Sequence, residues 1–170
     1  MPSRCGASGD GDLADDVLGG VVRQRDPEGA ARRVARVRAR RGLILDSSAV
    51  VAVLDREPGF EELERRMGRA DVLEIGAPTL VESAIVVGRA RGEAGIRRLS
   101  DFLDRMGIVI VPFDEPHADL ATVAFLDFGK GRHPARLNFG DCMTYATARR
   151  SGRPLLYTGE DFAQTDIQAA

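Results

Sequence analysis

Short apolar runs alternate with longer amphipathic segments along most of the chain, from residue 43 onward. Short runs bounded by glycine or polar residues are typical of buried strands, whereas apolar residues at three- and four-residue spacing are typical of helices. We expect strands at residues 43–46, 72–75, 108–111 and 155–157. We expect helices at residues 49–55, 60–69, 80–91, 93–106, 116–128 and 139–151. This alternation predicts the α/β fold class, with a mostly parallel sheet that is covered by helices on both faces.

The first 42 residues follow a different pattern. Glycine and aspartate are frequent in the first half of this segment, arginine is frequent in the second half, and large apolar residues are scarce. Such a segment buries too little apolar surface to offset the entropy cost of ordering it. We expect residues 1–42 to be a disordered tail, or an upstream extension that results from a misplaced start, with true initiation at Leu43. A basic arm that binds RNA is the third interpretation. Residues 43–170 are expected to form one domain.

The composition limits the classes of protein to consider. With 170 residues and 44% apolar content, the chain can bury one core of ordinary size. The formal net charge of -2 excludes a uniformly basic surface, so a nucleic acid would have to bind at a local basic patch. Cys5 and Cys142 lack the spacing of metal ligands, and the sequence has neither a signal-peptide pattern nor an apolar run of membrane-spanning length. We therefore expect a cytoplasmic protein without membrane contact.

Acidic residues recur at the ends of the predicted strands or at the start of the helices that follow them. They are Asp46, Glu82, Asp141 and the adjacent pair Glu160 and Asp161. Because ligands of open parallel sheets bind beyond the carboxyl ends of the strands, we expect these side chains to meet at one edge. Carboxylates at close range repel one another, and a divalent cation with oxygen ligands offsets their charge. The pattern therefore predicts a metal site suited to phosphoryl chemistry.

Each acid also has a purely local interpretation. Thr79 and Glu82 have the three-residue spacing of a helix capping box, and so do Asn138 and Asp141. The acid after the first strand, or the serine that follows it, is a suitable cap for the next helix. Taken singly, each acid could be a cap and nothing more. The convergence of all of them on one sheet edge is the argument for a shared site.

Four short motifs lie in order along the chain. They read LDSSAVVA at residues 45–52, TLVES at residues 79–83, LNFGDC at residues 137–142 and LLYTGEDF at residues 155–162. Together they resemble the PIN domain and, more narrowly, the VapC ribonuclease toxins of bacterial toxin–antitoxin pairs. The resemblance spans residues 43–167. It implies a PIN-like fold, with a central, mostly parallel sheet of four to five strands flanked by helices.

The resemblance implies a site for Mg²⁺, or for Mn²⁺ in its place, that includes Asp46, Glu82 and Asp141. Asp46 and Asp141 would hold the metal during hydrolysis of an RNA phosphodiester bond, and Glu82 would complete the ligand shell or orient the attacking water. The number of metal ions stays open. A hydroxyl of Ser47 or Ser48 could orient the first carboxylate or the water, and capping of the next helix is the other role for these side chains.

A fourth acid is harder to assign. Many PIN domains carry one three residues before the phenylalanine that corresponds to Phe162, where this chain has Gly159. We expect Asp161 to serve as the fourth catalytic and metal-binding residue, with Glu160 and Asp166 as the other candidates. The glycine also keeps open a second class of function, a PIN-like binding module with impaired catalysis. A nuclease that acts on DNA is the third class.

A basic loop precedes the third acid. Lys130, Arg132 and Arg136 lie between two predicted helices, among glycine and proline residues, and we expect them to contact RNA phosphates. A solvated loop without a ligand is the alternative. The early helices also carry more apolar residues than a small sheet needs for its core. The resemblance implies that such surface serves a homodimer and a VapB-like antitoxin, so we expect both as partners besides the RNA substrate.

Overall fold

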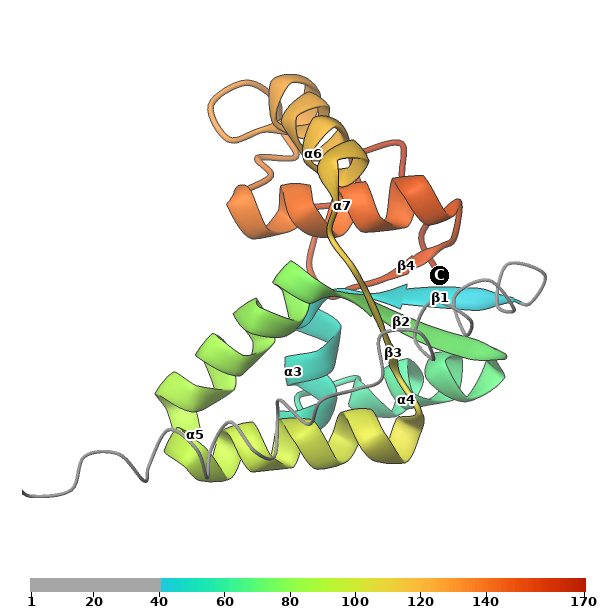
Figure 1. The fold of residues 1–170 in the computed structure, drawn as a ribbon, viewed down its shortest axis with the longest axis vertical. Helices are drawn as coiled ribbons and strands as arrows, with labels where there is room; N and C mark the ends of the chain where they lie inside the picture. Colours follow the sequence, from blue (N-terminus) through green and yellow to red (C-terminus); the bar gives the residue numbers. More distant parts are fainter. Residues whose placement is uncertain (1–40) are drawn as a thin grey trace, which may run out of the picture.

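The computed structural model describes residues 41–170, which form a sheet between two groups of helices (Figure 1). The strands are β1 (Gly42–Leu45), β2 (Val72–Gly76), β3 (Val109–Val111) and β4 (Leu155–Leu156). The helices are α3 (Ser47–Asp55), α4 (Phe60–Arg69), α5 (Ala77–Met106), α6 (Glu115–Phe128) and α7 (Phe139–Ser151). The strand order is β3-β2-β1-β4, and all neighbouring strands are parallel. The predicted α/β class and its sheet are confirmed.

The boundaries of the elements differ from the predicted ones by a few residues. β1 begins at Gly42 and ends before Asp46, which was expected to close the strand. Asp46 instead caps α3, so that this helix begins at Ser47. The interpretations of the N-terminal segment concern mainly residues 1–40, which lie outside the described residues.

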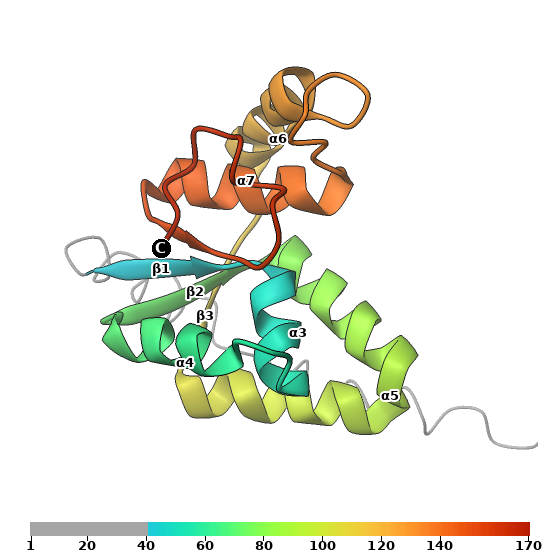
Figure 2. The ribbon, with the colours of Figure 1, turned by 180° about the vertical axis from the view of Figure 1, so that it is seen from behind.

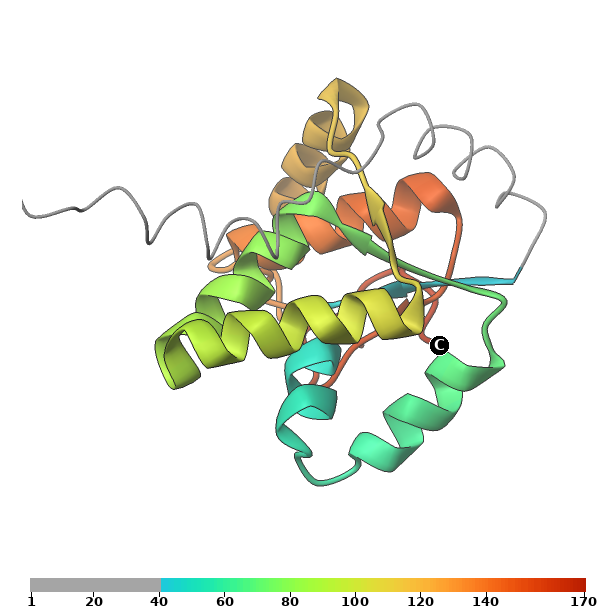
Figure 3. The ribbon, with the colours of Figure 1, turned by 60° about the horizontal axis from the view of Figure 1, so that its bottom comes forward.

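The helices predicted at residues 80–91 and 93–106 form one element, α5, with a kink at Gly92. The backbone there has φ of 59° and ψ of -149°, a conformation that residues with a side chain rarely adopt. The first half of α5 leaves from the end of β2, and the second half runs back toward β3 (Figure 3). The backbone is thus not helical at Gly92, and the two predicted helices meet there, as expected, and together cross over between two neighbouring parallel strands.

One apolar core lies on each face of the sheet. Leu43, Leu45 and Ile75 pack with α3, α4 and α5 on one face, and Figure 2 shows these helices below the sheet. Ile44 and Leu155 pack with α6 and α7 on the other face. Because successive side chains of a strand point to opposite faces and both faces are covered, the strands read as continuous apolar runs. Within residues 41–170 no helix is long and apolar enough to cross a membrane.

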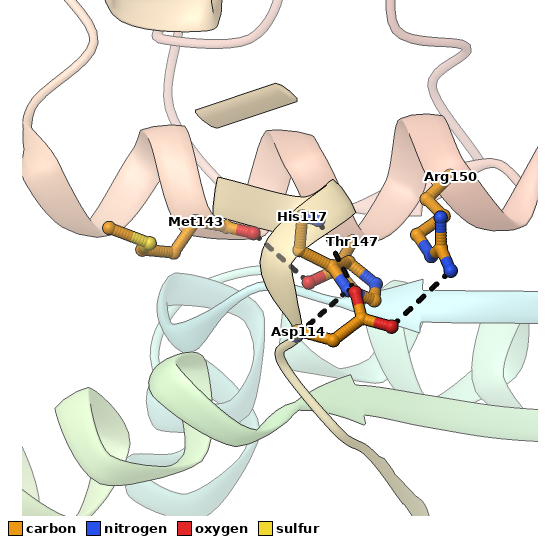
Figure 4. A network of polar contacts seen from close by, with 5 residues as sticks. All are labelled: Asp114, His117, Met143, Thr147 and Arg150. Carbon is orange, nitrogen blue, oxygen red and sulfur yellow. Dashed lines mark hydrogen bonds and ion pairs between the residues drawn. The ribbon is translucent and has the colours of Figure 1, made fainter. Parts of the chain in front are cut away.

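A polar cluster joins α6 to α7 (Figure 4). Asp114 caps α6, and its Oδ1 lies 2.5 Å from Nδ1 of the buried His117. Its Oδ2 lies 3.3 Å from a guanidinium nitrogen of Arg150 on α7. The Asp114 side chain is half exposed, so this ion pair adds little to the free energy of unfolding. The ion pair links α6 to α7, the two helices that cover the core around Ile44 and Leu155.

A buried ion pair lies near the start of β1. Oε2 of Glu74 in β2 is 2.6 Å from Nη1 of Arg153, which precedes β4, and the two side chains are 5% and 10% exposed. The guanidinium occupies the space that a Cβ atom at Gly42 would need. Burial raises the pKa of Glu74, and the positive charge of Arg153 opposes that shift. Each of these charges is removed from water and depends on its partner.

We expect Arg153→Met to destabilise the protein by about 3–5 kcal/mol, because it leaves the Glu74 carboxylate buried without its partner. Chemical denaturation followed by circular dichroism measures the change. The double variant Glu74→Leu/Arg153→Met removes both charges and should recover most of the loss. Equal losses in the single and double variants would show that packing of the arginine stem, and not charge balance, stabilises this region.

Candidate active site

The predicted acids lie around the carboxyl ends of the strands, at one edge of the sheet. Asp46 follows β1 directly, and Glu82 lies in the first half of α5, which follows β2. Asp141 lies in the first turn of α7, and Asp161 lies in the loop after β4. Because β1 pairs in parallel with both β2 and β4, the ends of these three strands face the same side. The topology of the sheet therefore gathers acids that are far apart in the sequence.

Asp46 is buried, and the helix that it caps fixes its carboxylate. Its Oδ2 accepts hydrogen bonds from the Ser48 backbone N–H at 3.0 Å and from the Ser48 hydroxyl at 2.5 Å. That hydroxyl oxygen accepts in turn from the backbone N–H of Thr158 at 3.0 Å. Ser48 thus connects the first acid to the loop after β4. Sequence analysis did not identify this link, because no local pattern indicates a contact between such distant residues.

Asp141 forms the capping box that its spacing from Asn138 predicts. The Asn138 backbone N–H donates to Oδ2 of Asp141 at 2.7 Å, and the Asp141 backbone N–H donates to Oδ1 of Asn138 at 3.0 Å. Both bonds join groups at the start of α7. The local interpretation of this acid is therefore confirmed. It does not compete with the functional one, because the cap orients a carboxylate that also faces the other acids.

Glu82 faces the start of α7. The predicted capping box of Thr79 and Glu82 is wrong, because α5 begins earlier, at Ala77. Thr79 is instead buried, and its hydroxyl lies 2.8 Å from that of Thr144 in α7. A Cβ atom at Gly140 would lie 2.5 Å from Oε1 of Glu82. The absence of a side chain at this glycine therefore lets the carboxylate approach the helix that carries the third acid.

Burial and neighbouring negative charges raise the pKa of two of the acids, Asp141 and Glu82. The pKa of Asp141 is raised from 3.8 to about 6, with burial as the largest cause and the hydrogen bond from the helix cap opposing it. The negative charges of Asp46, Asp161 and Glu82 add to this shift. Burial also raises the pKa of Glu82, against a hydrogen bond from Ser47, and the charge of Asp46 adds to it. The acids therefore form one electrostatically connected cluster.

The candidates for the fourth acid lie in different surroundings. Asp161 is the candidate whose charge acts on Asp141. The tyrosine that follows β4 has a pKa raised by burial first and by the charge of Glu160 second. Asp166 accepts a hydrogen bond from the Tyr145 hydroxyl at 2.7 Å and pairs with an arginine of α7. The structure thus brings Asp161 toward the other acids, and its role in metal binding stays a prediction.

The donor set of the cluster consists of carboxylate oxygens, the ligands that Mg²⁺ and Mn²⁺ prefer, so its chemistry fits such an ion. In the part of the chain that the structure describes, no three histidine, cysteine, aspartate or glutamate side chains are already placed to hold a metal ion. Carboxylates without a counter-ion repel one another, so a cation would have to draw them together. Asp161 is exposed, and exposed side chains change rotamer rapidly.

The basic loop predicted to contact RNA connects α6 to α7 (Figure 1). It is closed at its base, where the Lys130 backbone N–H donates to the Leu137 carbonyl at 3.0 Å. Lys130, Arg132 and Arg136 line an open pocket of about 460 Å³ together with a histidine, a glycine and a proline. Cationic side chains around an open pocket suit a phosphate group. The contact with RNA itself stays a prediction.

Asp141→Asn should stabilise the metal-free protein above about pH 6. The folded-state pKa of Asp141 lies above its ordinary value, so the folded state binds this proton more tightly than the unfolded chain does. Wild-type stability therefore falls as the pH rises from about 4 to about 6, and it stays lower above that range. Asparagine carries no charge, and its Oδ1 can still accept the bond from the Asn138 N–H.

Thermal unfolding in EDTA at several pH values measures this effect. We expect the variant to melt a few degrees above the wild type near neutral pH and to show a weaker dependence on pH. Asp119→Asn, at an exposed position of α6, is the matched control. A variant that melts below the wild type at every pH would mean that the charged cap contributes more to stability than the repulsion removes.

Comparison with known proteins places the chain in a family. The family model of the PIN domain matches residues 43–168. The Ribonuclease VapC of Mycolicibacterium smegmatis is 42% identical over 127 residues, which cover 75% of this chain and 98% of that protein. Ribonuclease VapC30 of Mycobacterium tuberculosis is 40% identical over 125 residues, which cover 74% of this chain and 95% of that protein.

Solved structures show the same fold. VapC20 of Mycobacterium tuberculosis, a sarcin-ricin loop cleaving toxin, aligns with a TM-score of 0.63 and 12% identity, covering 75% of this chain and 98% of that one. VapBC2 from Rickettsia felis, bound to promoter DNA, aligns with a TM-score of 0.57 and 18% identity, covering 75% and 96%. At such identities the likeness concerns the fold alone, whereas the sequence matches extend over most of both chains. The predicted resemblance is thus confirmed: the chain belongs to the PIN-domain family and, within it, to the VapC ribonucleases.

Proposed function

We propose that this protein is a metal-dependent endoribonuclease that acts in the cytoplasm as the toxin of a VapBC-type pair. The observation that carries the proposal is the placement of Asp46, Glu82, Asp141 and Asp161 around the carboxyl ends of parallel strands, and the raised pKa of Asp141 agrees with it. Clusters of carboxylates that repel one another lower stability, and perturbed groups of this kind concentrate at functional sites. Relatives at 40–42% identity are named ribonucleases, which supports RNA as the substrate.

Four acids would hold the metal ion. Asp46 and Asp141 would bind Mg²⁺, or Mn²⁺ in its place, and Glu82 and Asp161 would complete the ligand shell. When bound, the ion supplies activation of a water molecule and offsets the charge that develops on the phosphate in the transition state. The hydrolysis of a phosphodiester bond in RNA follows from this combination.

Hydrogen bonds from the chain itself orient these ligands. The Ser48 hydroxyl donates to Asp46, and the Asn138 backbone N–H donates to Asp141. A third bond, from Ser47, reaches the glutamate of α5. Ligands that are oriented in advance require less rearrangement during the reaction. These donors are therefore positioning groups for the cluster.

The basic loop would bind the RNA backbone. Lys130, Arg132 and Arg136 concentrate positive charge in a chain whose formal net charge is -2. Arg132 lies over an aromatic ring of α6, with its guanidinium carbon 5.3 Å from the ring centroid, which limits the directions it can take. Phosphate contacts of this kind fix the strand without reading its sequence.

We infer a homodimer and a VapB-like antitoxin as protein partners. Val81, Ile85 and Val86 are 59%, 48% and 42% exposed on the first half of α5. An apolar stripe beside Glu82 suits contact with another protein. The Rickettsia felis neighbour is a VapBC complex, which supports an antitoxin as one partner. Occupation of this stripe would place the antitoxin close to the acids.

RNA cleavage should require both a divalent cation and the carboxylates. We expect purified protein to cut total cellular RNA into discrete products with Mg²⁺ or Mn²⁺ and not with EDTA. Asp46→Asn should lower the rate at least about 100-fold, whereas the control Asp119→Asn should retain it. Matched RNA and DNA hairpins separate the alternatives. Cutting of DNA alone would indicate a DNA-directed nuclease, and no cutting by folded protein that binds Mn²⁺ would indicate a binding module.

The adjacent acids Glu160 and Asp161 allow a matched test of the fourth ligand. Asp161→Asn should weaken Mn²⁺ binding, measured by calorimetry, and RNA cleavage by about 10–100-fold, because it removes a charge that acts on the cluster. Glu160→Gln should change both by less than about twofold, since its charge acts elsewhere. The reverse result would assign the role to Glu160.

A further inference from the structure

Phe139 is the most exposed of the large apolar side chains in residues 41–170. It is 79% exposed, and Val81, the next in order, is 59% exposed. Burying an aromatic ring is strongly favourable, so a ring in water is available to a ligand. Single exposed apolar residues are common on protein surfaces, however. The position of Phe139 therefore decides whether its exposure indicates a binding role.

Phe139 lies next to residues of the acid cluster in the sequence, where hydrogen bonds fix the backbone. It is the first residue of α7, directly after the cap residue Asn138 and two positions before Asp141. The capping box fixes the backbone on both sides of it. The next residue, Gly140, lies against the carboxylate of Glu82. The ring is therefore presented from a fixed point beside the carboxylates.

The basic loop lies on the other side of the ring in the sequence. It ends at Leu137, two residues before Phe139, and it carries the pocket lined by Lys130, Arg132 and Arg136. Along this short segment a pocket lined by cationic side chains, an exposed aromatic ring and a carboxylate of the cluster follow one another. Proteins that bind single-stranded nucleic acid combine a positively charged path for the backbone with aromatic rings on which bases stack.

We propose that Phe139 stacks on an unpaired base of the RNA next to the scissile phosphate, while the basic loop holds the neighbouring phosphates. This inference rests on the proposed ribonuclease function and adds a positioning residue to it. Stacking accepts every base, so the ring would fix the place of the strand rather than select its sequence. It would also favour cleavage in loops, where bases are free to leave the stack, over cleavage in duplexes.

The surroundings of the ring favour a base over a protein as its ligand. The centres of protein interfaces are depleted in charged residues. Along the chain, Phe139 lies between the basic loop and Asp141, whereas Val81, Ile85 and Val86 form an apolar stripe on one helix. The stripe therefore suits a protein partner. A single exposed ring between charged segments of the chain suits a nucleotide, which combines an apolar face with a phosphate.

Two substitutions separate stacking from apolar contact. Phe139→Leu keeps an apolar side chain without an aromatic face, and Phe139→Trp keeps the face. With an RNA hairpin that the wild type cuts in its loop, Phe139→Leu should raise KM about 10-fold with kcat within about twofold, and Phe139→Trp should stay close to the wild type. Val123→Ala, at an exposed position of α6, is the control and should change neither constant.

The substrate provides the complementary test. In the same hairpin, loss of the base beside the cut should raise KM for the wild type and leave KM for Phe139→Leu unchanged. A Phe139→Leu variant with wild-type KM would overturn the proposal, and so would a loss of affinity that is equal on intact and abasic RNA. A change of particle mass in light scattering without a change in KM would assign the ring to a protein interface instead.

A binding assay keeps this inference distinct from the nuclease function. A hairpin with 2-aminopurine at each loop position in turn should lose fluorescence on binding wild-type protein in EDTA, because stacking quenches that base, and Phe139→Leu should not produce the loss. Wild-type protein that cuts no RNA would contradict the ribonuclease proposal. The fluorescence assay would still show whether Phe139 stacks on a base. Absence of quenching by the wild type at every position would overturn the stacking proposal.

Discussion

Repulsion between carboxylates at one edge of the sheet is the constraint on which the rest of the structure depends. Parallel strands end on the same side, and here that side carries acids that raise the pKa of Asp141 beyond the effect of burial. The two cores on the faces of the sheet supply stability away from this edge. The buried pair of Glu74 and Arg153 lies against Gly42, at the start of β1, whereas the acids lie beyond the end of that strand.

Close approach between helices is the second requirement of the site. The hydroxyls of Thr79 and Thr144 meet between α5 and α7, and Gly140 leaves room for the Glu82 carboxylate. Larger side chains at the contact would move the helices apart and separate the acids that they carry. Small residues here therefore have a geometric role, although none of them is an expected ligand. Ser48 has a similar role for the loop after β4.

The sequence predicted most elements because their apolar periods are regular, and it predicted the fold through family resemblance. Local spacing was less reliable for helix starts. Asn138 caps α7 as expected, whereas the same spacing at residues 79–82 fails because Pro78 already lies in the first turn of α5. Contacts such as that between Ser48 and Thr158 depend on strand order and leave no local signature. The sequence likewise does not distinguish Glu160 from Asp161 in the loop after β4, because only the folded chain determines which charge acts on Asp141.

The loop between α6 and α7 is closed at its own base by the bond between Lys130 and Leu137. Its tip can therefore gain, lose or exchange residues without displacing the helices on either side. In evolutionary terms, the proposed hold on the RNA backbone and the proposed hydrolytic centre would then be separate units of selection. After gene duplication, copies of one ancestor can retain the same acids while their loops diverge. Under the proposed function, such copies would share a fold and an acid cluster and differ in how tightly they hold an RNA backbone.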